Sequence, residues 1–134
     1  MLKSALIAAL MGLIALPASA ETLTVQFSKL TPKGTLMVAL YKGEEAYTSG
    51  KPVAGQQVAV SSDTATATFE VEPGQYGLKI FHDVNGNGQM DKNPFGMPVE
   101  PFAFSNNAKG RMGPAAWADA AFEVKGNTTQ DIAF

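Results

Sequence analysis

The chain has 134 residues, no Cys and a formal net charge of −2 at pH 7. Its ten Lys and Arg residues are scattered, and because nucleic-acid binding needs a basic cluster that neutralises phosphates, nucleic acid is not an expected partner. Without Cys the fold has no disulfides, so its stability has to come from packing or from a bound ion.

Residues 1–20 have the pattern of a secretory signal peptide. Lys3 precedes an apolar run at residues 5–16, and Ala18, Ser19 and Ala20 supply the small residues of a cleavage site. The apolar run has twelve residues, which is too short for a membrane-spanning helix of about 20 residues. We therefore expect an exported protein, periplasmic or secreted, whose mature chain has no transmembrane segment and forms a single domain over residues 21–134.

Strands are predicted where apolar and polar residues alternate with a period of two. Seven such runs cover residues 21–27, 35–41, 58–60, 65–71, 75–82, 121–124 and 131–134. The second run is apolar on both faces, which indicates a central strand covered on both sides, and we expect it to pair with the first. Seven short strands and no long helix predict an all-β, two-sheet sandwich with one long irregular loop.

The irregular loop lies between residues 82 and 121. Loops longer than about 12 to 15 residues are uncommon in compact domains and tend to be functional or disordered, and four large aromatic residues in this loop argue against disorder. Aromatic residues this numerous are more often part of a core, but they also suit a ligand platform. The expected ligand or partner surface comprises His82, Phe95, Glu100, Phe104, Ser105, Asn106, Asn107 and Trp117.

The start of the loop resembles the first part of an EF-hand calcium loop. Oxygen-bearing residues stand at alternate positions from 1 to 9, and Gly88 stands at position 6, where the chain has to turn sharply. Calcium prefers six to eight oxygen ligands, and short side chains at alternate positions can converge on one ion. The expected calcium ligands are Asp83, Asn85, Asn87, Gln89 and Asp91.

The calcium pattern is incomplete, which leaves two interpretations open. Position 12, where an EF-hand has a bidentate Glu, is Pro94. A site completed by water or by Glu100 would be weak, with a dissociation constant of roughly 10⁻⁴ to 10⁻³ M. The alternative is that the two Asn-Gly pairs and the Asp residues form tight turns without any ion.

Other metals fit the sequence less well. His82 is the only histidine, so the usual zinc site with three or four N or S ligands cannot form. Met90, Met97 and Met112 with His82 would suit Cu(I), but their spacing matches no regular ligand pattern, and Met more often fills gaps in a core.

Several motifs in the second half of the chain resemble a known family. They are Phe81-His82-Asp83, Asn85-Gly86-Asn87-Gly88, Phe95-Gly96, Phe104-Ser105-Asn106-Asn107-Ala108 and Gly113-Pro114. They resemble the exported bacterial family numbered 2141 among domains of unknown function. The resemblance implies a transthyretin-like (prealbumin-like) or carboxypeptidase-regulatory-like β-sandwich with no established activity. The hydroxyisourate hydrolases related to transthyretin use several His and Arg residues, whereas this chain has one of each.

These patterns together predict an exported, non-enzymatic β-sandwich in which a calcium-stabilised loop binds an unidentified small molecule or partner protein. Two alternatives stay open. One is a small hydrolase that uses His82 as base and Ser105 as nucleophile. The other is a purely structural surface-assembly module, which would expose an apolar patch and self-associate.

Overall fold

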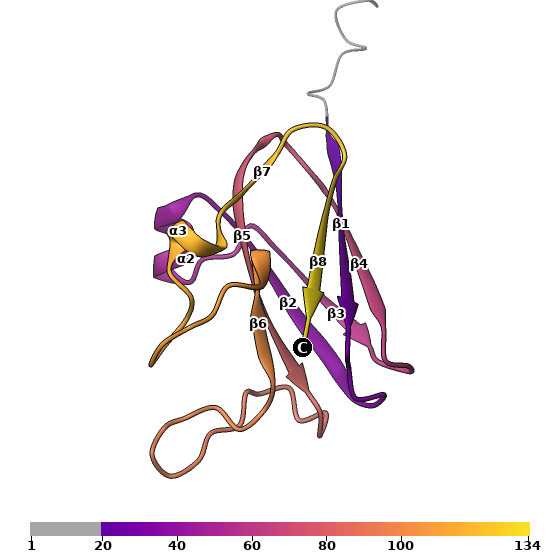
Figure 1. The fold of residues 1–134 in the computed structure, drawn as a ribbon, viewed down its shortest axis with the longest axis vertical. Helices are drawn as coiled ribbons and strands as arrows, with labels where there is room; N and C mark the ends of the chain where they lie inside the picture. Colours follow the sequence, from indigo (N-terminus) through magenta and orange to yellow (C-terminus); the bar gives the residue numbers. More distant parts are fainter. Residues whose placement is uncertain (1–19) are drawn as a thin grey trace, which may run out of the picture.

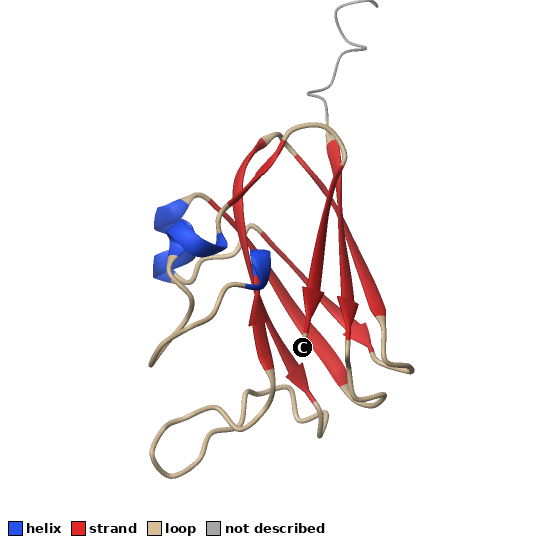
Figure 2. Cartoon of the chain, in the orientation of Figure 1, coloured by secondary structure: helices blue, strands red, loops and turns tan. Residues whose placement is uncertain are grey.

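The computed structural model describes residues 20–134, so the predicted signal peptide lies outside the described residues except for Ala20. Figures 1 and 2 show two β-sheets packed face to face, with short helices at one side. This arrangement confirms the predicted all-β, two-sheet sandwich. Within residues 20–134 the eight strands are β1 (Glu21–Ser28), β2 (Thr35–Lys42), β3 (Ala54–Ala59), β4 (Ala65–Val71), β5 (Gly74–Asp83), β6 (Phe102–Phe104), β7 (Phe122–Val124) and β8 (Thr128–Ala133).

The smaller sheet has the order β4-β1-β8. Strand β1 pairs antiparallel with β4 and parallel with β8, so both of its edges are occupied. The prediction that residues 35–41 pair with the first strand is therefore wrong, because β2 belongs to the other sheet. Alternation shows which face of a strand is buried, but it carries no information about which strand occupies each edge.

The larger sheet has the order β3-β2-β5-β6, and β7 also pairs with β5. The two short strands β6 and β7 share one edge of β5, at residues 79–81 and 74–76 respectively. Strand β6 is an eighth strand beyond the seven predicted, and it lies within the segment expected to be irregular. It divides the long loop into two parts, residues 84–101 and 108–116.

The core lies between the two sheets. Leu23, Val25 and Phe27 of β1 face it from one side, and it is lined on the other side by alternate residues of β2 and β5, including Leu36 and Leu78. Strand β2 lies inside its sheet, between β3 and β5, as its two apolar faces predicted. Its second face points away from the core and becomes important below.

Short helices cover one end of the larger sheet's outer face. They are α2 (Glu44–Ser49), the 3₁₀ helix η1 (Ser105–Asn107) and α3 (Trp117–Ala120). Tyr41, Tyr47, Phe104 and Ala120 form a second, smaller apolar cluster there, with Trp117 packed against it. Within residues 20–134, no helix has the length and apolar character needed to cross a membrane.

Candidate ligand-binding site

The loop after β5 begins at a buried carboxylate. Asp83 is 2% exposed, and its two oxygens accept hydrogen bonds from the backbone N–H groups of Asn87 (3.2 Å) and Gly88 (2.6 Å). Gly86 and Gly88 have positive φ angles, which glycine adopts without steric cost. The chain therefore turns tightly around the Asp83 carboxylate.

Glu100 connects the two ends of the same turn. Its carboxylate is mostly buried and accepts hydrogen bonds from the N–H of Val84 (2.8 Å) and the N–H of Asp91 (3.0 Å). A second link joins the N–H of Val99 to the carbonyl of Asp91 at 2.9 Å. Glu100 thus holds residues 84–91 against the segment that leads into β6.

The structure joins the side chains of four of the five expected calcium ligands in one hydrogen-bonded network, and Gln89 joins it through its backbone N–H alone. The side-chain amides of Asn85 and Asn87 donate hydrogen bonds to the Asp91 carboxylate at 2.6 and 2.7 Å. The backbone N–H of Asn87 donates to the Asp83 carboxylate. Gln89 contributes its N–H to the Asn87 side chain and is itself exposed. This geometry is that of Asx turns. Among the described residues no three His, Cys, Asp or Glu side chains are grouped so that they could hold a metal ion, so a calcium ion here would take most of its oxygen ligands from Asn side chains, the backbone and water.

Within residues 20–134, the carboxylates of this network have no basic partners. In the described part of the chain the one ion pair is Lys42 with Glu72 (3.0 Å), far from the loop in sequence. Asp83, Asp91 and Glu100 are therefore compensated by N–H donors alone. A hard cation would complement this charge if the two Asn amides turned their oxygens inward.

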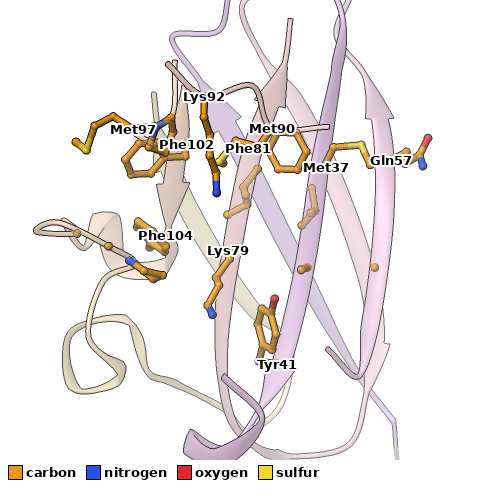
Figure 3. Close-up of a pocket in the computed structure, with 18 of the residues that line it drawn as sticks. Met37, Tyr41, Gln57, Lys79, Phe81, Met90, Lys92, Met97, Phe102 and Phe104 are labelled. Carbon is orange, nitrogen blue, oxygen red and sulfur yellow. The ribbon is translucent and has the colours of Figure 1, made fainter. Parts of the chain in front are cut away.

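A cavity of about 800 Å³ lies on the outer face of the larger sheet. Its floor is formed by β3, β2, β5 and β6, and its walls by residues 90–98 of the loop and residues 110–114. Figure 3 shows Met90 and Lys92 of the loop above the sheet, close to Phe81 and Phe102 in this view. The lining is mainly apolar, and all four Met residues of the described chain belong to it: Met37, Met90, Met97 and Met112.

The four methionines do not form a copper site in this arrangement. In Figure 3, Met37 and Met97 lie at opposite sides of the cavity with Met90 between them. Met112 is fully exposed. His82, the remaining candidate ligand, faces the core and does not line the cavity.

Lys79 and Tyr41 line one end of the cavity, and Tyr47 packs against both of them. The Lys79 ammonium donates a hydrogen bond to the Tyr47 carbonyl (2.7 Å) and lies 4.7 and 4.3 Å from the ring centroids of Tyr41 and Tyr47. Burial lowers the pKa of Lys79 and raises the pKa of Tyr47 to about 12. The Trp117 ring packs against the Tyr47 ring, with centroids 5.5 Å apart, and so helps to hold Tyr47 in place at this end of the cavity.

His82 and Ser105 are both buried, but they have separate partners. The His82 Nε2 lies 2.6 Å from the Lys33 carbonyl oxygen, whereas the Ser105 hydroxyl donates to the Ala120 carbonyl and accepts from the N–H of Leu78. Leu78 and His82 are four residues apart on β5, roughly 13 Å along the strand. The two side chains therefore do not form the nucleophile–base pair that the hydrolase interpretation requires.

Asn106 and Asn107 join the 3₁₀ helix to neighbouring elements. The Asn106 side chain donates to the carbonyls of Asp119 and Ala121. The Asn107 side chain bonds the carbonyl of Asp131 and the N–H of Ala133 on β8. Both residues have positive φ angles near 60° and 53°, which Asn adopts more readily than most residues. The Asn107 hydrogen bonds thus connect η1, which follows β6 of the larger sheet, to β8 of the smaller sheet.

Of the predicted ligand surface, Phe104 lines the cavity and Trp117 supports it, while Phe95 is 89% exposed at the loop. Sequence reasoning missed the sheet residues of the floor, above all Met37, Lys79 and Phe81. The second apolar face of β2 could have indicated Met37, because an outer sheet face that is apolar has to be covered by something. It gives no indication of Lys79 or Phe81, which lie on β5.

Comparison with known proteins identifies a family but no activity. The model of an uncharacterized protein conserved in bacteria, DUF2141, matches residues 25–132. No curated protein and no solved structure matches the chain. The specific relation to transthyretin-like folds therefore stays a prediction.

Proposed function

The chain belongs to DUF2141, a bacterial family without an assigned activity, and we propose that it is an exported, non-enzymatic protein that binds an apolar ligand in the cavity over the larger sheet. Residues 90–98 of the loop at residues 84–101 form one wall of this cavity. Asp83, Asp91 and Glu100 hold the base of the loop, and calcium strengthens it when bound there.

The observation that carries this proposal is the cavity itself. Small-molecule sites are concave, mainly apolar, of roughly 300 to 1,000 Å³, with a few polar groups, and the cavity of about 800 Å³ with its methionine and phenylalanine lining fits that description. Methionine adapts its shape to irregular ligands because its side chain is unbranched and polarizable. The separate partners of His82 and Ser105 support binding in preference to hydrolysis.

The binding proposal is tested with N-phenyl-1-naphthylamine, a neutral dye that fluoresces in apolar surroundings. We expect saturable binding of one dye per chain. Ala39→Trp places a large side chain on the cavity floor and should abolish the signal, whereas Thr66→Trp on the exposed face of β4 should leave it unchanged. No saturable binding, or equal loss in both variants, would contradict the proposal.

The calcium part has its own test, a melting curve in chelator and in excess calcium. Binding to the native state alone adds RT ln(1 + [L]/Kd), so ~10 mM calcium at a ~1 mM site raises the unfolding free energy by about 1.4 kcal/mol. Asp91→Asn should remove the rise in melting temperature. Asp83 is less suitable for this test because its carboxylate already fixes the turn. An unchanged melting temperature in calcium would leave the ion-free Asx turns.

Exposed apolar side chains at the loops give the assembly alternative a specific basis. Phe95, Met97, Val99 and Met112 are between 53% and 101% exposed, and contiguous apolar surface often marks an interaction site. Size-exclusion chromatography separates the two functions. A monomer that binds the dye supports ligand binding, and an oligomer that dissociates in Phe95→Ser and does not bind the dye supports assembly.

A further inference from the structure

The cavity carries charge of one sign only. Lys79 on β5 and Lys92 on the loop are its charged lining residues, and within the described chain no Asp or Glu lines it. Composition does not explain this, since the chain has 12 acidic residues against 10 basic ones. The lining of the cavity therefore has a positive charge in a protein whose net charge is negative.

Lys79 is the better placed of the two amines. It is half-buried on the cavity floor, fixed by its hydrogen bond to the Tyr47 carbonyl and by the rings of Tyr41 and Tyr47. An ammonium has three N–H donors, and the structure gives one of them a hydrogen-bond acceptor. No carboxylate of residues 20–134 forms an ion pair with it.

A charge in apolar surroundings is costly unless an opposite charge compensates it. Burial already lowers the pKa of Lys79, which is the direction expected for an ammonium without a counter-charge. In Figure 3 the Lys79 amine is at the Tyr41 end of the cavity, and the apolar residues Phe81, Phe102 and Met90 extend from there toward the loop. The cavity thus offers a cationic end and a long apolar body.

We propose that the cavity binds a free single-chain amphiphile with one anionic group, whose anion pairs with the Lys79 ammonium while its apolar chain lies against Phe81, Phe102 and Met90. This inference rests on the proposed ligand-binding function. Lys92, exposed on the loop, adds positive charge at the mouth, where water and salt weaken its effect.

Competition against bound N-phenyl-1-naphthylamine tests the inference with decanoate, decanol and decyltrimethylammonium, which share a chain and differ in charge. We expect decanoate to bind about 10- to 100-fold more tightly than decanol, the range for a hydrogen bond to a charged group. Decyltrimethylammonium should bind most weakly.

Variants of Lys79 assign the preference to one side chain. With each competitor's affinity measured against the variant's own affinity for the dye, Lys79→Met should lose the difference between decanoate and decanol, and Lys79→Arg should keep it. Lys125→Met, the matched control, removes an exposed lysine that does not line the cavity and should leave the ratio unchanged. Equal affinities of the three competitors in the unmodified protein, or a preference that survives Lys79→Met, would overturn the inference. Absence of dye binding would instead overturn the proposed function. A second assay measures binding to anionic vesicles: a protein that binds the vesicles but not free decanoate would overturn the assignment to a free amphiphile.

Discussion

Replacing Glu100 by Ala should lower the unfolding free energy by about 2 to 3 kcal/mol. The Glu100 carboxylate accepts two backbone N–H groups, from Val84 at 2.8 Å and from Asp91 at 3.0 Å. Hydrogen bonds to a charged group contribute about 1.5 to 3 kcal/mol each, so two of them set a ceiling of about 3 to 6 kcal/mol. The expected value is smaller because water reaches the released N–H groups of a surface loop.

Urea unfolding measures this effect, and two further variants make the comparison specific. Glu100→Gln keeps one oxygen acceptor and should lose about half as much stability as Glu100→Ala. Glu123→Ala removes an exposed carboxylate from β7 and should change stability by less than about 0.5 kcal/mol. Dye binding should weaken in Glu100→Ala because the loop wall is released. A Glu100→Ala protein as stable as Glu123→Ala would refute the role given to Glu100.

Three other predictions concern the remainder of the fold. Gly77→Ala should lower the free energy of unfolding by about 1 to 3 kcal/mol, because the added Cβ would lie 2.8 Å from Tyr47 and 3.1 Å from Trp117. Gly55→Ala is the control: its Cβ would meet no atom closer than 3.5 Å, so it should be nearly neutral in the same urea titration. The free energy of unfolding should fall as pH rises from about 10 to 12, because burial raises the pKa of Tyr47 to about 12 in the folded state, whereas the unfolded chain releases this proton near pH 10. Urea unfolding at pH 9 and pH 11 should show the fall. A Tyr47→Phe protein with the same fall would contradict the assignment to Tyr47. Asn107→Ala should accelerate hydrogen exchange in β8 and cost about 1 to 2 kcal/mol, and unchanged exchange there would show that its two bonds to β8 contribute nothing.

Alternation in the sequence predicted the class of fold and seven of the eight strands of residues 20–134. It missed β6, and it placed at residues 58–60 the strand that the structure has at Ala54–Ala59. Leu23, Val25 and Phe27 read as one buried face and are one, and the two apolar faces of β2 correctly indicated an inner strand. Which strands are neighbours could not be read in the same way. The backbone edges that decide pairing are chemically alike in every strand, so β1 was given the wrong partner.

Of the residues predicted for a ligand surface, the cavity lining includes Phe104, and the remaining lining residues were not predicted for that surface. The calcium-like spacing predicted that Asp83, Asn85, Asn87 and Asp91 lie close together, and they are joined by hydrogen bonds. Their short separation in the sequence restricts the distances between them. Ser105 and His82, expected at a surface, are buried and bonded to backbone groups. The floor of the cavity draws on four strands that are distant in sequence, and no local pattern shows that Met37 and Lys79 share it.

The most direct test of ligand binding is an NMR titration of protein labelled at its methionine methyl groups. Met37 and Met90 lie on the floor and the loop wall of the cavity, so both methyl signals should shift in step with saturation by decanoate or by the dye. Ala39→Trp should suppress both shifts. Saturable binding that leaves Met37 and Met90 unchanged would show that the ligand binds elsewhere and would contradict the account.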